Sequence, residues 1–166
     1  PYESRDEYAY HSGRVVMDLI RDNLRPRDIL TRKAFENAAT VVAASGGSTN
    51  AGLHLPALAA ECGIEFDLHD VAEIFKRTPY IADLKPGGKY VARDLFAVGG
   101  VPILMKALME GGFLHGDCIT VTGKTIAENL EDVVFPEDQD VVYKTSAPLS
   151  PTGGVVGLRG NLAPEG

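Results

Sequence analysis

The sequence has no tryptophan and only two cysteines, Cys62 and Cys118, which stand far apart. Cysteines this sparse exclude a disulfide framework and indicate reduced thiols of an intracellular protein. No apolar stretch reaches the ~18 residues that a membrane span needs, and the first residues lack the pattern of a signal sequence. The 16 basic residues are outnumbered by 23 acidic ones, and the net charge of -7 argues against a nucleic-acid-binding surface. These absences predict a cytoplasmic protein with neither a membrane nor nucleic acid as a partner.

The hydrophobic residues, 45% of a chain of 166, suffice for the core of one domain or for pieces of two. Helical spacing, caps and glycine stops predict helices over residues 6–24, 32–44, 49–62, 67–75, 90–96, 103–109 and 124–130. Apolar and β-branched runs predict strands over residues 80–84, 119–122, 141–143 and 155–158. We therefore predict an α/β fold class. A mostly helical end of an α/β domain occupies residues 1–112, a hinge and the first strands of a β-rich domain occupy residues 113–166, and the two parts have separate cores.

A glycine pair, Gly46-Gly47, precedes Ser48, Thr49 and Asn50 and then an apolar helical run. Glycine takes backbone angles that are closed to other residues and lets a ligand approach the main chain. Any of the three polar residues can cap the helix, and the free N–H groups and dipole of its first turn favour an anion. Such turns are equally typical of a capped helix that only packs against a neighbour. The residues alone leave both interpretations open.

Two further side chains are candidates for the same cavity. His54 follows Asn50 by four residues, so both lie on one face of the helix, although a buried structural histidine is an equal alternative. Lys85 follows a predicted strand and enters a Pro-Gly-Gly turn, and ligands bind at such strand ends in α/β proteins. Lys85 is thus a candidate partner for a substrate carboxylate, with an exposed loop lysine as the plain alternative.

Two other motifs suggest chemistry that the sequence does not support. Gly123-Lys124-Thr125 is similar to the end of a phosphate-binding P-loop, but Cys118 stands where that motif needs glycine. A tight turn capped by Thr125 is the preferred interpretation. His115 and Cys118 have the spacing of two metal ligands, but no second pair lies nearby, and a zinc site or an iron–sulfur cluster needs three or four ligands. We therefore predict no metal site in this chain.

Several blocks of the sequence, colinear over nearly the whole chain, resemble the dihydroxy-acid dehydratases. They are residues 31–38, 46–51 with 54–55, 83–90, 98–102, 115–118, 120–125, 128–130 and 160–166. The resemblance extends to the wider family that includes sugar-acid and phosphogluconate dehydratases. Several blocks are most similar to the branched-chain amino-acid enzymes.

This resemblance implies a cytoplasmic, homodimeric lyase. Such an enzyme removes water from a 2,3-dihydroxy-3-methyl carboxylic acid, a small molecule, and forms a 2-keto acid in valine and isoleucine biosynthesis. The resemblance further implies an iron–sulfur cluster that acts as a Lewis acid on the leaving 3-hydroxyl, a magnesium ion, and a base that removes the proton from carbon 2. It also implies an α/β N-terminal domain and a C-terminal β-barrel-like domain. This agrees with the change from mostly predicted helices to mostly predicted strands near Gly112.

The same resemblance implies what this stretch leaves out. Cluster cysteines, magnesium carboxylates and a modified lysine belong to earlier blocks, and the serine base belongs to a later one. The chain is therefore expected to be an internal fragment, inactive alone, with no catalytic residue and neither cluster nor magnesium of its own. Ser48, Thr49 and Asn50 are expected nearest the substrate, with His54 and Lys85 behind them. The alternatives are a sugar-acid (aldonate) dehydratase and a non-catalytic scaffold or dimerisation segment.

Overall fold

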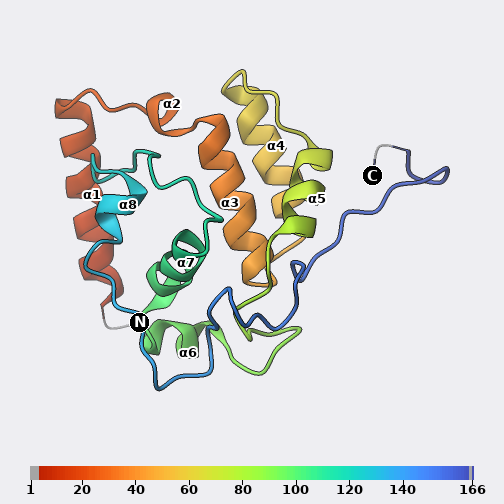
Figure 1. Cartoon of the computed structure of the whole chain (residues 1–166). Coiled ribbons are helices and arrows are strands. Elements are labelled where there is room, and N and C mark those ends of the chain that lie inside the picture. The colour runs from red at the N-terminus through yellow and green to blue at the C-terminus, as the bar shows by residue number, and fades with distance from the viewer. Residues whose placement is uncertain (1–3, 165) are drawn as a thin grey trace.

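The computed structural model describes residues 4–164 and 166, and its regular structure is helical (Figure 1). In chain order the helices are α1 (Arg5–Arg21), α2 (Pro26–Ile29), α3 (Arg32–Ala44), α4 (Ala51–Glu61), α5 (Leu68–Arg77), α6 (Ala92–Ala97), α7 (Gly100–Glu110) and α8 (Ile126–Asn129). The predicted helices are confirmed within a few residues at their ends, and α2 is an additional turn of helix that begins at Pro26. α4 runs through Pro56 without ending there.

Side-chain caps explain where three of these helices begin. The Thr31 hydroxyl accepts a hydrogen bond from the third residue of α3 at 3.3 Å. Asp67 caps α5 by accepting two backbone N–H groups, at 2.8 and 3.0 Å. Thr125 and Glu128 form a reciprocal capping box at the start of α8, with bonds of 3.2 and 2.7 Å. The Gly123-Lys124-Thr125 segment is therefore the capped turn that the sequence predicts.

The predicted strands over residues 80–84, 119–122, 141–143 and 155–158 are wrong as regular strands. Within the described residues the first three form only isolated bridges, among them Ala82 with Val142, and residues 155–158 form none. Prolines close to residues 80–84 and glycines around residues 155–158 interrupt the extended backbone before a ladder can grow. The mostly helical character that we predicted for this part of the fold is confirmed, and its few extended segments pair only through isolated bridges. The β-barrel-like part of the prediction stays a prediction.

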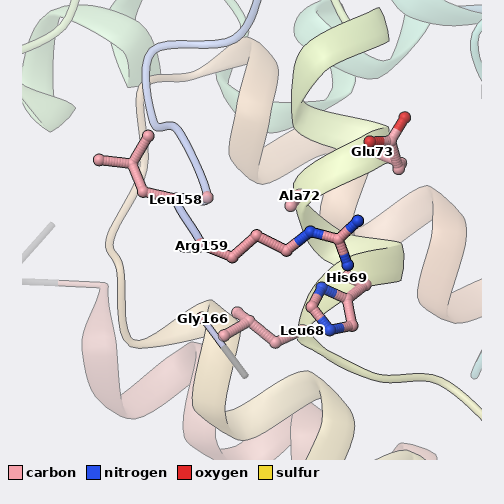
Figure 2. Close-up of a pocket in the computed structure, with 8 residues that line it drawn as sticks. Leu68, His69, Ala72, Glu73, Leu158, Arg159 and Gly166 are labelled. Carbon is pink, nitrogen blue, oxygen red and sulfur yellow. The ribbon is translucent and has the colours of Figure 1, made fainter. Parts of the chain in front are cut away.

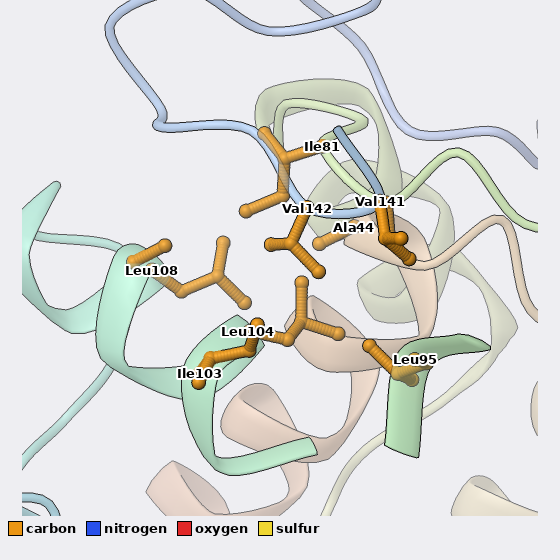
Figure 3. Close-up of a cluster of buried hydrophobic side chains, with 10 residues drawn as sticks. Ala44, Ile81, Leu95, Ile103, Leu104, Leu108, Val141 and Val142 are labelled. Atoms are coloured by element: carbon orange, nitrogen blue, oxygen red, sulfur yellow. The ribbon is translucent and has the colours of Figure 1, made fainter. Parts of the chain in front are cut away.

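The central core joins both halves of the chain. Leu104 and Leu108 of α7 pack against Ile81 and Val142, which come from the paired extended segments (Figure 3). Two backbone bonds hold these segments together, Asp83 N–H to Val141 O at 2.8 Å and Tyr143 N–H to Ile81 O at 2.7 Å. Residues before and after the predicted boundary thus share one core, contrary to our expectation of two. The boundary near Gly112 itself stays a prediction.

α3 lies between this core and a second one. Ala44 at its end belongs to the central core, whereas Phe35 and Ala43 pack with Val71 and Phe75 of α5 in the second cluster. Packing on both sides fixes the direction of α3 and therefore the position of the glycine turn that follows it.

α1 differs from the other long helices because none of its residues is buried. Val16 and Ile20, two of its apolar residues, are 53% and 67% exposed. Among the described residues, no helix has both the length and the apolar character needed to cross a bilayer.

Candidate substrate-binding cleft

The glycine pair forms a tight turn at the end of α3. Gly46 has φ +64°, a left-handed conformation that suits glycine, and the Gly47 N–H donates to Val42 O at 2.9 Å. The Ser45 hydroxyl donates back to Val41 O at 2.8 Å. These bonds satisfy the last carbonyls of α3 and turn the chain sharply toward Ser48.

A second turn contains Lys85 and is stabilised by hydrogen bonds to Asp83. Asp83 is 7% exposed, and one of its carboxylate oxygens accepts the Lys89 N–H at 3.3 Å. The Lys85 N–H donates to Tyr90 O and the Gly88 N–H to Leu84 O, both at 2.8 Å. A Cβ at Gly88 would lie 2.4 Å from Asp83 atoms, so this close approach requires glycine. The turn therefore presents Lys85 outward from a fixed base.

Both turns line one cleft of about 750 Å³. Its lining consists of residues 45–49, residues 84–87, Tyr80 and residues 154–155. The fold thus brings Lys85 into one cleft with Ser48 and Thr49, which precede it by 37 and 36 positions. All three are predicted from the sequence. This volume falls in the range of small-molecule pockets.

The other two predicted residues do not line the cleft. Asn50 is the exposed N-cap residue of α4, and its side chain makes no capping bond. His54 is exposed on the same helix, so the alternative of a buried structural histidine is wrong. Their part in substrate binding stays a prediction.

Several hydrogen-bond donors in the lining remain free. The backbone N–H groups of Ser48, Thr49 and Gly87 have no acceptor among the described residues. The Ser48 hydroxyl accepts the Asn50 N–H at 3.2 Å and keeps its own hydrogen for another partner. Together with the Lys85 ammonium group, these donors suit a ligand rich in acceptor oxygens.

Sequence reasoning missed Tyr80. Its ring is enclosed by glycines: a Cβ at Gly46 would lie 2.8 Å from the ring, one at Gly154 3.6 Å from it, and one at Gly87 3.7 Å from the hydroxyl. The hydroxyl donates to Leu84 O at 3.3 Å. Burial and then the nearby Asp83 charge raise the pKa of Tyr80. The sequence gives no signal for Tyr80, because these three glycines come close to one another only in the folded chain.

A charged network fixes the other end of α3. The Arg32 guanidinium bonds to the Asp70 carboxylate of α5 at 2.6 and 3.0 Å and to Glu36 at 3.1 Å, and it covers the Phe66 ring. Glu36 also contacts the His115 Nε2 at 2.7 Å. Burial alone would raise the pKa of Glu36, but hydrogen bonds from Arg32 and His115 outweigh it and lower the pKa. For Asp70 the bond from Arg32 is the main cause of its lowered pKa.

This network predicts a loss of stability in acid. The folded chain holds both carboxylates below their ordinary pKa values of 3.8 and 4.5, so it binds fewer protons than the unfolded chain. The stabilisation is complete above pH 4.5 and is lost as the pH falls through the folded values. Arg32→Gln should lower the free energy of unfolding by about 1 kcal/mol at pH 7, a modest loss because the partners are partly exposed. It should also make the stability depend less on pH, because the cause of the lowered pKa values is removed. Urea unfolding from pH 3 to 7 measures it. Arg21→Gln, at an exposed pair with Asp18, is the control, and identical profiles for both variants would contradict the assignment.

A smaller hollow of about 170 Å³ lies between α5 and the C-terminal tail. Figure 2 shows Arg159 of the tail extending toward His69 and Glu73 of α5. It contains none of the residues predicted from the sequence, and its volume is below the usual range for a small-molecule pocket. The larger cleft is therefore the candidate site.

Known protein families and sequences contain clear matches to this chain. Residues 1–129 match the family model described as dihydroxy-acid/6-phosphogluconate dehydratase N-terminal. This chain belongs to that family. It is 70% identical over its whole length to dihydroxy-acid dehydratase 2 of Bradyrhizobium diazoefficiens and 69% identical to dihydroxy-acid dehydratase of Parvibaculum lavamentivorans. A dihydroxy-acid dehydratase of Sulfurisphaera tokodaii is 53% identical over 165 residues. The chain spans about 29% of the length of the first two relatives and 30% of the third.

The cofactors implied by the dehydratase family do not fit the ligands in this stretch. Cys118 is 7% exposed in an apolar cluster with Ile126 and Leu130, and burial, followed by the Asp117 charge, raises the pKa of its thiol. A cluster ligand must be a thiolate, which this environment disfavours. Cys62 is the C-cap residue of α4. No group of three or more His, Cys, Asp or Glu side chains suited to a metal occurs among the described residues.

Proposed function

We propose that the protein carrying this chain is a dihydroxy-acid dehydratase and that the cleft forms one wall of its substrate pocket. The observation that carries the proposal is that Lys85, Ser48 and Thr49 line the same cleft and that this cleft has a suitable size. Membership of the dehydratase family and the names of the relatives support the same reaction class.

In this proposal the residues of the chain bind and orient the acid. The Lys85 ammonium group pairs with the substrate carboxylate. Ser48, Thr49 and the free N–H groups of their turn donate hydrogen bonds to the other oxygens of the acid. Binding at both ends of a short molecule fixes the carbon that loses its proton and the carbon that loses its hydroxyl. Asn50 and His54, which lie outside the cleft lining, remain candidates for further contacts with the acid. The groups that make and break bonds come from outside residues 1–166.

The finer properties of the whole protein belong to the same proposal. They are an iron–sulfur cluster and a magnesium ion held by other parts of the polypeptide, a homodimer, a cytoplasmic location and a C-terminal β-barrel-like domain that begins after Gly112. The family membership supports them as expectations.

Turnover of the full reading frame that carries this chain tests the function. We expect it to convert 2,3-dihydroxy-3-methylbutanoate to the 2-keto acid and to prefer it over a pentonate. Lys85→Ala should raise KM about tenfold through loss of one charge-assisted hydrogen bond. Lys124→Ala, on an exposed turn outside the cleft lining, is the matched control.

A preference for the pentonate would indicate a sugar-acid dehydratase. Equal KM values for both lysine variants, with Asn50→Ala also unchanged, would favour the scaffold interpretation.

A further inference from the structure

Tyr80 occupies a position in the cleft that the proposed function does not yet use. Its ring packs closely against the glycine turn, because a Cβ at Gly46 would lie 2.8 Å from the ring and force a shift. A Cβ at Gly154 would lie 3.6 Å from the ring, and one at Gly87 would lie 3.7 Å from the hydroxyl, both at ordinary van der Waals distance. The contact with Gly46 therefore restricts the position of the ring.

The direction of the hydroxyl is also held. Tyr80 donates its hydrogen to Leu84 O at 3.3 Å, which leaves the oxygen lone pairs as the free hydrogen-bonding groups. An oxygen arranged in this way accepts a hydrogen bond from a ligand and does not supply one. Free donors also line the cleft, among them the Lys85 ammonium group and the N–H groups of Ser48 and Thr49.

We propose that the Tyr80 hydroxyl accepts a hydrogen bond from a hydroxyl group of the substrate, so that the cleft distinguishes the dihydroxy acid from the keto acid formed from it. This inference rests on the proposed function. The substrate carries two O–H donors, whereas a 2-keto acid offers only acceptor oxygens. A fixed acceptor therefore stabilises the bound substrate and gives nothing to the product.

The raised pKa of Tyr80 agrees with this role, because the phenol keeps its proton near neutral pH and with it the bond to Leu84 O. The residue binds and selects the ligand. It is not a base in the reaction.

Tyr80→Phe in the full reading frame tests the inference, since it keeps the ring and removes only the hydroxyl. We expect KM for 2,3-dihydroxy-3-methylbutanoate to rise about fivefold, with kcat within about twofold, because one neutral hydrogen bond is lost. The inhibition constant of 2-keto-3-methylbutanoate should stay unchanged. Tyr90→Phe is the matched control, because it removes a hydroxyl that bonds to Asp140 at 2.6 Å outside the lining.

Two results would overturn the inference in different ways. If Tyr80→Phe weakens the dihydroxy acid and the keto acid equally, or weakens neither, Tyr80 does not select between them while the proposed function stands. If the unsubstituted protein does not act on the dihydroxy acid at all, the proposed function fails and the inference fails with it. Thermal unfolding of both phenylalanine variants verifies that they are folded.

Discussion

Gly46→Ala should lower the free energy of unfolding by about 2.5 kcal/mol, whereas Gly63→Ala should lower it by about 1 kcal/mol. Both glycines follow a helix and have similar backbone angles, φ +64° and +71°. A Cβ at Gly63 meets nothing within 4 Å, but one at Gly46 would lie 2.8 Å from the Tyr80 ring. The difference between the two losses therefore measures the contact between the glycine turn and Tyr80.

Urea unfolding of the two variants provides the measurement. In a Tyr80→Ala background the clash is removed, so Gly46→Ala should then cost only about as much as Gly63→Ala. Equal losses in the unsubstituted background would show that the turn does not rest on Tyr80, and the described cleft would be wrong at its centre.

Leu108→Ala should destabilise the chain by about 3 kcal/mol through loss of buried surface and the cavity left behind. Leu108 is 0% exposed in the central core, beside the segments that carry Ile81 and Val142. Ile81 directly follows Tyr80 and precedes the Lys85 turn. The same change should therefore also make the positions of these cleft residues less fixed.

Chemical denaturation monitored by circular dichroism measures this loss, and Leu53→Ala is the matched control on α4. Leu53 is 72% exposed, so its truncation should change stability by less than about 0.5 kcal/mol. Similar losses for the two leucines would contradict the assignment of Leu108 to the core.

Features set by neighbouring residues could be predicted from the sequence. The caps at Thr31, Asp67 and Thr125 depend on bonds within three positions, and α3, α5 and α8 begin directly after them. The glycine turn and its polar residues were also visible, because Gly46 needs a conformation that few other residues adopt.

Features set by distant residues could not be predicted in the same way. Whether residues 80–84 form a strand depends on partners near residue 142 and on the prolines that bound the segment, so the strand prediction failed. Asn50 and His54 share a helix face, but that face does not line the cleft. Tyr80 gains its position from glycines at 46, 87 and 154, which only the fold brings together.

A crystal structure of the full reading frame bound to 2,3-dihydroxy-3-methylbutanoate tests the central claim most directly. The account predicts the acid between the two turns, with its carboxylate within about 3 Å of the Lys85 ammonium group and its other oxygens bonded to Ser48 or Thr49. An acid bound elsewhere, with the cleft between Ser48 and Lys85 filled by other protein side chains, would contradict it.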